Sequence, residues 1–442
     1  MNKPSHSGNS FEANSSVSRR YFLKKTALLG LTAVVPAAVM NLGTAEAAAA
    51  ATASEIPTAK IQGRKRARDL GIRIGRMTPG KWNAITDVPG VKVGYSTIIE
   101  GDGPLVVGKG PIRTGVTVIL PHDGDLKSDP IYAGFHSFNG NGEMTGIHWV
   151  KESGLLTSPV AITNTHSVGV VRDALIAYDV NHERIESGWA LPVVAETWDG
   201  RLNDLNGFHV KPEHVFEALD SAKNGPIQEG NVGGGTAMNC HGFKGGTGTA
   251  SRVLSKEQGG YTVGVLVQTN YGSRELLRVN GVPVGLEIST DEVPGVGIPK
   301  SAPKTASIED IGSTLEPGSG SIIIIVATNA PLLPGQCDRL AQRATVGLAR
   351  MGGTGSNGSG DIFLAFTTGN RGMEAEGASP KTVGTLSSGS MSVLFEAVAE
   401  ATEEAILNSM CMATTMVGIN GVTSNELPLD RLVQVMKKYN RM

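Results

Sequence analysis

The chain has 442 residues, of which 40% are hydrophobic and 18% charged, a balance typical of folded proteins and unlike that of disordered ones. Its formal net charge is −2, and no basic patch or interleaving of basic and aromatic residues stands out, so nucleic acid is not an expected partner. The three cysteines, Cys240, Cys337 and Cys411, are an odd number without metal-ligand spacing. This count favours buried small hydrophobic side chains over a complete disulfide framework or a metal site.

Residues 1–47 are predicted to be an export signal rather than part of the fold. Ser18–Lys24 matches the twin-arginine motif S-R-R-x-F-L-K, an apolar run of Ala27–Met40 follows, and Ala45–Ala47 supplies a small-x-small cleavage site. The run is short for a membrane span of about 20 residues, although an uncleaved anchor is the alternative. Removal of the signal takes away five basic and two acidic side chains and leaves 34 and 39, a formal charge of −5. We therefore expect a periplasmic protein with no membrane segment after removal of its signal.

Strands and helices are predicted to alternate through the rest of the chain, without a linker that would separate two domains. The predicted strands are Val91–Tyr95, Gly115–Leu120, Val160–Thr163, Leu191–Glu196, Tyr261–Thr269, Ser321–Val326 and Ile362–Phe366. The predicted helices are Val168–Tyr178, Cys337–Met351, Met391–Met416 and Leu429–Tyr439. The third helix has a small and apolar face, from Val393 to Ala405, that suits close packing on a sheet. The mixture predicts one α/β domain, 48–442, of sheets layered with helices.

The junction between Gly320 and Ser321 carries the clearest chemical signal. A tract rich in Pro, Gly and Ser, 292–320, has no helical or strand period and is predicted to be an exposed, flexible loop. It leads into Ser321–Val326, which is apolar at odd and even positions alike after the serine. This pattern predicts a strand buried on both faces. A self-cleaving N-terminal nucleophile hydrolase needs a hydroxyl at this place, because cleavage frees an α-amine that can serve as its base. The alternative is an ordinary loop that ends at a buried strand.

Other segments combine polar or glycine residues next to strands, and each has an ordinary structural alternative. In Ser359–Asp361 a hydroxyl and a carboxylate could converge on one site, or the segment could be a turn that caps a strand. Glu196–Trp198 suits a substrate ammonium or a solvated turn. Asn164–Ser167 opens a helix, where capping is favoured over contact with a ligand. The runs Gly233–Thr236 and Gly245–Thr249 permit close approach of backbone or ligand, or are plain turns.

In their order along the chain, these segments resemble the DmpA/β-aminopeptidase family of self-processing aminopeptidases, which release N-terminal residues from peptides, amides or esters. The resemblance covers nearly all of the chain beyond the signal. The blocks that carry it are Arg66–Ile72, Asn83–Val91, Asn139–Gly146, Thr163–Asp173, Phe243–Arg252 and Gly320–Pro331. Blocks of this length in this order are much more specific than the short motifs above.

The resemblance implies a self-cleaved chain and gives roles to individual residues. It implies cleavage at Gly320–Ser321 into chains 48–320 and 321–442, with Ser321 as nucleophile in both self-cleavage and turnover. Ser359 matches the family's second serine, which hydrogen-bonds in the nucleophile's network. Asp361 stands where characterised members carry a glutamate, and Asn270 matches the asparagine that stabilises the oxyanion.

The resemblance also implies how substrate binds and how the chain assembles. Glu196 matches the acid that holds the substrate's ammonium, and Trp198 falls where DmpA itself has a tyrosine. The implied fold is an αββα sandwich, layered like the N-terminal nucleophile hydrolases but connected differently, in a homotetramer without metal or cofactor. Peptides, amides or esters are the implied substrates. Two alternatives remain: acyl transfer from the same acyl-serine to an amine, and a secreted binding protein of this fold without catalysis.

Overall fold

The strand that begins at Ser321 lies in the interior of a six-stranded sheet. β11 (Ser321–Thr328) pairs antiparallel with β10 (Thr262–Asn270) on one side and parallel with β12 (Ile362–Thr367) on the other. All eight of its residues are buried, which confirms the predicted burial of this strand on both faces. Because Ser321 is the first residue of β11 and Asn270 the last of β10, the antiparallel register places these two residues opposite each other.

Two sheets are built from strands distributed over most of the chain. The six-stranded sheet has the order β4-β3-β12-β11-β10-β9, in which the strands not yet described are β3 (Ile131–Ser137), β4 (Leu155–Leu156) and β9 (Thr247–Val253). The second sheet has the order β1-β2-β5-β6, made of β1 (Lys92–Glu100), β2 (Ile112–Leu120), β5 (Val160–Asn164) and β6 (Val193–Thr197). β5 and β6 are parallel, so the polar residues at their carboxyl ends meet at one edge of this sheet.

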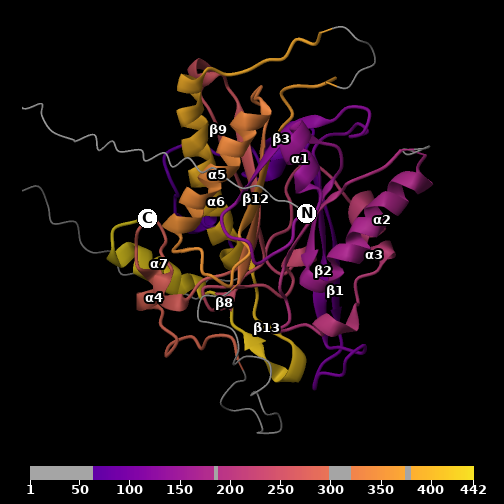
Figure 1. Ribbon diagram of the computed structural model, residues 1–442. Coiled ribbons are helices and arrows are strands. Elements are labelled where there is room, and N and C mark those ends of the chain that lie inside the picture. The colour runs from indigo at the N-terminus through magenta and orange to yellow at the C-terminus, as the bar shows by residue number, and fades with distance from the viewer. Residues whose placement is uncertain (1–62, 184–187, 298–319, 374–379) are drawn as a thin grey trace, which may run out of the picture. The chain divides into compact units, whose positions relative to one another are not determined.

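Helices cover the outer faces of both sheets, as Figure 1 shows. α5 (Pro334–Arg350) and α6 (Met391–Met412) pack on the six-stranded sheet, while α2 (Val168–Asn181) and α3 (Pro212–Asp220) pack on the four-stranded one. The inner faces of the sheets meet in an apolar core that includes Ile119, Ile162, Leu266, Ile323 and Leu364. The order helix, sheet, sheet, helix confirms the expected αββα layering.

Several smaller elements complete the fold, and some were not predicted. They are α1 (Ile147–Ser153), α4 (Val284–Glu287), α7 (Leu429–Lys438), the pair β7 (Asn239–Cys240) and β8 (Phe243–Lys244), and the pair β13 (Met416–Val417) and β14 (Thr423–Ser424). The elements that were not predicted from the sequence are α1, α3, α4, β3, β4, β9 and the four strands of the two short pairs. β9 begins inside one of the glycine-rich runs, Gly245–Thr249, where small and hydroxyl side chains hide the period of a strand.

α6 lies so close to β9 that side chains at the contact must be small. Ala397, Ala401 and Ala405 are fully buried, as their spacing predicted. A Cβ atom at Gly248 of β9 would stand only 2.0 Å from the carbonyl oxygen of Ala405, so this glycine serves the close approach of two backbones. The helix ends at Met412, four residues earlier than predicted. The Arg64 side chain donates hydrogen bonds to the carbonyl oxygens of the last turn, and the chain then turns extended toward β13.

The computed structural model describes residues 63–183, 188–297, 320–373 and 380–442, which all lie within one compact unit, 56–442. The predicted export signal, 1–47, and most of the tract before Ser321, 298–319, lie outside the described residues. Within the described ranges no helix is both long and apolar enough to cross a membrane. All three cysteines are buried and unpaired, which confirms their interpretation as small hydrophobic side chains.

Candidate active site

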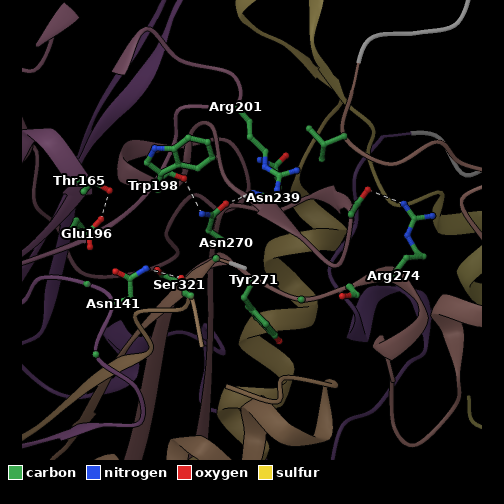
Figure 2. A pocket seen from close by; sticks show the side chains of 18 of the residues that line it. Asn141, Thr165, Glu196, Trp198, Arg201, Asn239, Asn270, Tyr271, Arg274 and Ser321 are labelled. Atoms are coloured by element: carbon green, nitrogen blue, oxygen red, sulfur yellow. Dashed lines mark hydrogen bonds between the residues drawn. The ribbon is translucent and has the colours of Figure 1, made fainter. Parts of the chain in front are cut away.

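A cavity of about 680 Å³ opens where the carboxyl ends of β6 and β10 approach the start of β11. Among the residues that line it are five of the seven predicted site residues, Gly320 and the four that Figure 2 labels: Ser321, Asn270, Glu196 and Trp198. A cavity of this size falls in the range that holds small organic ligands. The structure therefore brings together residues that lie far apart in the sequence; Glu196 and Ser321 are separated by 125 positions.

Ser321 presents its hydroxyl at the start of β11, close to backbone donors. The backbone N–H of Gly360 donates to Ser321 Oγ at 3.1 Å. The residue is only 6% exposed, so the hydroxyl lies at the floor of the cavity. On the other side of the peptide bond, a Cβ atom at Gly320 would stand 1.9 Å from the carbonyl oxygen of Asn270. Only glycine fits at the residue before the serine.

Ser359 and Asp361 do not line the cavity but stand behind Ser321, the predicted nucleophile. Ser359 Oγ donates to Asp361 Oδ1 at 2.6 Å, and the backbone N–H of Ile322 donates to the same oxygen at 3.1 Å. Asn139 Nδ2 donates to the other carboxylate oxygen at 3.1 Å. Burial raises the pKa of Asp361, while these hydrogen bonds lower it. The convergence of hydroxyl and carboxylate is thus observed, and the aspartate is long enough to join Ser359 to the residue that follows Ser321.

Asn270 is held by two hydrogen bonds that fix the orientation of its amide. Its Nδ2 donates to the carbonyl oxygen of Trp198 at 2.8 Å, and the backbone N–H of Asn239 donates to its Oδ1 at 3.0 Å. The second hydrogen on Nδ2 has no partner among the described residues. A fixed amide donor at the end of β10, opposite Ser321, is suited to a negatively charged oxygen that develops on a carbonyl under attack.

The hairpin of β7 and β8 that supports Asn270 contains a buried lysine. Lys244 Nζ donates to the carbonyl oxygens of Met238 and Gly245, at 2.7 and 2.9 Å. Burial lowers the pKa of Lys244 to about 7. These bonds tie both ends of the β7–β8 turn together and so hold the Asn239 N–H against Asn270.

Glu196 is a buried carboxylate at the end of β6. The backbone N–H of Glu143 donates to its Oε1 at 3.0 Å, and the Thr165 hydroxyl donates to its Oε2. The residue is 3% exposed, and burial raises its pKa above the ordinary value. No ion pair to it is formed among the described residues, although the charge of nearby His166 lowers its pKa. A buried carboxylate that faces a cavity in this way is suited to a cation supplied by the ligand, which excludes the solvated-turn alternative.

The contacts of Thr165 and its neighbours show that the predicted helix cap at Asn164–Ser167 was wrong. Asn164–Ser167 was expected to cap the helix that follows, but neither Asn164 nor Ser167 makes a capping hydrogen bond. Asn164 Nδ2 instead donates to Thr114 Oγ1, and Thr165 binds the Glu196 carboxylate and lines the cavity. The reason is the parallel pairing of β5 and β6, which puts the end of β5 directly beside Glu196.

Trp198 contributes through both its backbone and its ring. Its carbonyl oxygen accepts the hydrogen bond from Asn270, and its indole lines the cavity (Figure 2). The hydrogen bond to Asn270 uses the main chain, so the change from tyrosine to tryptophan leaves that contact intact. Functional groups that sequence reasoning missed are Thr165, Asn139, Asn239 and the Gly360 N–H. Only Asn139 and Thr165 had a signal, as members of the blocks that carry the family resemblance.

Comparison with known proteins places this site in a family. Residues 83–424 match the model described as peptidase family S58. The chain belongs to peptidase family S58. It is 51% identical over 378 residues to a β-peptidyl aminopeptidase BapA of Sphingosinicella microcystinivorans, which covers 85% of this chain and 93% of the relative. This family and these relatives identify the chain as a hydrolase of the aminopeptidase type.

Solved structures agree with this assignment. A β-aminopeptidase from a Burkholderia species matches with a TM-score of 0.74 and 49% identity, over 85% of this chain and 99% of the other. The L-aminopeptidase D-Ala-esterase/amidase of Ochrobactrum anthropi, described as a new variant among the Ntn hydrolase fold, matches with a TM-score of 0.74 and 42% identity over the same shares. The expected family and the expected fold class are confirmed, and Ser321 at the start of a core strand fits an N-terminal serine nucleophile.

Proposed function

We propose that this S58 enzyme is a self-processing serine aminopeptidase that removes N-terminal residues through an acyl-Ser321 intermediate. One observation carries the proposal: the hydroxyl at the start of β11 and the unpaired buried carboxylate of Glu196 line the same cavity. A hydroxyl beside a buried carboxylate that forms no ion pair within the described ranges selects a substrate with a free ammonium close to the carbonyl that is attacked. The names of the relatives suggest β-peptides or D-residue amides and esters as substrates.

Self-processing is the first step. Ser321 Oγ attacks the carbonyl carbon of Gly320, the bond from that carbon to the nitrogen of Ser321 breaks, and the nitrogen takes up the proton. Water then hydrolyses the resulting ester, which frees the Gly320 carboxylate and restores the Ser321 hydroxyl. The new α-amine has an ordinary pKa of roughly 7.7–8.0, which suits a general base near neutral pH.

Turnover uses the same groups on an external substrate. Glu196 holds the substrate ammonium, and Ser321 Oγ attacks the acyl carbon while the α-amine accepts the hydroxyl proton. The free Nδ2 hydrogen of Asn270 stabilises the oxyanion, a contribution of about 2.7–4 kcal/mol for such a donor. The proton passes to the leaving amine, and water hydrolyses the acyl-enzyme. Asp361, oriented by Ser359, holds the N–H of Ile322, the second residue of β11, during both steps.

Intact mass spectrometry of the parent and of S321A tests the proposal. The parent should give two chains, the smaller of which begins at Ser321, and S321A should stay uncut and inactive. The processed parent should release the first residue from peptides with a free amine and leave N-acetylated peptides untouched. A parent that remains one chain, or that hydrolyses both peptides equally well, contradicts the proposal.

We also propose that the processed enzyme is periplasmic and tetrameric. The twin-arginine motif of Ser18–Lys24 supports the first statement and the family resemblance the second. Cell fractionation and sedimentation of the exported protein test them, and a cytoplasmic or monomeric enzyme would contradict them.

A further inference from the structure

Arg201 is a cation that lines the cavity and has no partner among the residues that the structure describes. Its side chain lines the cavity, and it makes no hydrogen bond or ion pair to any residue in the described part of the chain. Burial lowers its pKa, so the side chain is partly withdrawn from water. A partly buried guanidinium without acceptors is unfavourable unless a ligand supplies them.

The neighbouring Arg274 shows what a structural arginine looks like at the same site. Its guanidinium stacks 3.3 Å above the ring of Phe243 and donates to five backbone carbonyl oxygens. The acceptors belong to His241, Gly242, Ile288, Ser289 and Val293. The donors of Arg274 are thus occupied by the loops that it joins, whereas those of Arg201 are free to bind a ligand.

Arg201 and Glu196 stand apart along the cavity. In the view of Figure 2, Glu196 lies on one side of Ser321 and Asn270, and Arg201 lies on the other. The remaining acidic side chains that line the cavity, Glu143 and Glu275, are exposed at its rim and make no ion pair with Arg201. The cavity therefore presents a carboxylate at one end and a guanidinium beyond the nucleophile.

This polarity fixes where the two ends of a substrate lie. When the substrate ammonium is at Glu196 and its acyl carbon at Ser321, the leaving part must extend away from Glu196. A short peptide carries a negative charge at the end of that part, its C-terminal carboxylate. A guanidinium binds a carboxylate through two parallel hydrogen bonds, which makes it specific for this group.

We propose that Arg201 binds the C-terminal carboxylate of the substrate, so that the enzyme prefers short peptides with a free C-terminus over the corresponding amides. This inference rests on the proposed aminopeptidase function and adds the leaving side of the substrate to it. Arg201 is a specificity residue: it takes no part in bond breaking and selects what Ser321 attacks.

Matched substrates test the inference. β-Alanyl-alanine and alanyl-alanine are each compared with their C-terminal amides, as substrates of the processed parent and of R201Q. The parent should favour the free acid by about 10- to 100-fold in kcat/KM, mainly through KM, as expected for a charge-assisted pair of hydrogen bonds. In R201Q the ratio of acid to amide should fall to within about threefold of one. R201K keeps the charge without the planar fork and should give an intermediate ratio.

Controls separate the possible causes of failure. Self-cleavage of R201Q at Ser321 reports that the variant has folded, and R201K supplies the comparison if R201Q does not cleave. R73Q changes an exposed arginine outside the cavity lining and should keep the parent's ratio. A ratio near one in the parent, or an unchanged ratio in both Arg201 variants, overturns the inference alone. A processed parent that hydrolyses none of the four peptides overturns the proposed function itself.

Discussion

The substitution E196Q isolates the charge that we expect to select the substrate ammonium. Glutamine keeps the shape of the side chain, and its oxygen can still accept the backbone N–H of Glu143. The Thr165 hydroxyl, which donates to Glu196 in the parent, can rotate and accept a hydrogen bond from the new amide. The local structure should therefore survive, and self-cleavage, which involves no ammonium, should proceed as in the parent.

The expected loss in kcat/KM follows from removal of the negative charge that the substrate ammonium would bind at Glu196. A hydrogen bond to a charged group is worth about 1.5–3 kcal/mol. At 1.36 kcal/mol for each tenfold change, kcat/KM should fall by about 10- to 150-fold. E143Q is the matched control, because Glu143 also lines the cavity but is exposed. An exposed charge contributes only about 0–1 kcal/mol, so E143Q should lose less than about fivefold.

The pH profile of kcat/KM gives an independent reading of the same residue. Burial raises the pKa of Glu196 above its ordinary value of 4.5. Only the ionised carboxylate attracts the ammonium, so the parent should lose kcat/KM as the pH falls through this raised pKa. The α-amine base gives parent and E196Q the same first limb near its own pKa of roughly 7.7–8.0. Only the parent should show a second loss at lower pH, through the raised pKa of Glu196, and E196Q should lack this second limb.

Three results would refute this reasoning. They are an E196Q enzyme within about threefold of the parent, equal losses in E196Q and E143Q, and a second acid limb, below that of the α-amine, that persists in E196Q. Measurement needs only initial rates on a peptide with a free amine, from pH 4 to 9, with the processed enzymes. An E196Q chain that fails to self-cleave would show instead that the carboxylate is required for folding or processing.

Two crowded glycines, Gly248 and Gly320, give further predictions, each with an uncrowded glycine as its control. G248A places a methyl group 2.0 Å from a carbonyl oxygen of α6 and should lower stability by about 1–3 kcal/mol, seen as a lower unfolding midpoint in uncut protein. G169A on α2 meets nothing within 4 Å and should raise stability by about 0.5–1 kcal/mol, so equal midpoints would contradict the packing argument. G320A forces the scissile carbonyl away from Asn270 and should slow self-cleavage by about 10- to 100-fold on a gel time course. G297A, with open space around it, should cleave at the parent's rate, and parental cleavage by G320A would show that the fit is not needed.

The features of the site that could be predicted are those that depend on residues adjacent to one another in the sequence. A strand of four isoleucines and a valine after Ser321 has only one stable environment, a core buried on both faces, and the structure places it there. Asn270 and Glu196 were found through resemblance, at the ends of strands whose apolar runs were visible. The small face of α6 was predicted from its spacing, although its end was set by Arg64, which lies far away in the sequence.

The remainder depends on strand pairing that no local pattern reveals. Thr165 looked like a helix cap because its own neighbours offer capping sites, and only the β5–β6 pairing shows that Glu196 competes for its hydroxyl. The Gly360 N–H is a backbone group without any side-chain signature. β9 was hidden because its residues are small, a property required by α6 rather than by the strand itself.

The place of β11 in the sheet has a consequence for the two-chain molecule that cleavage would produce. A new chain end usually frays, because nothing holds its first residues. Here the end would lie between two neighbouring strands, with Asn270 opposite its first residue and the Asp361 carboxylate bound to the N–H of its second. Separation of the two products would require breaking the backbone hydrogen bonds that pair β10 with β11 and β3 with β12. Cutting the backbone should thus leave an inseparable pair, in which the amine at Ser321 is released from its peptide bond while the strand around it stays paired.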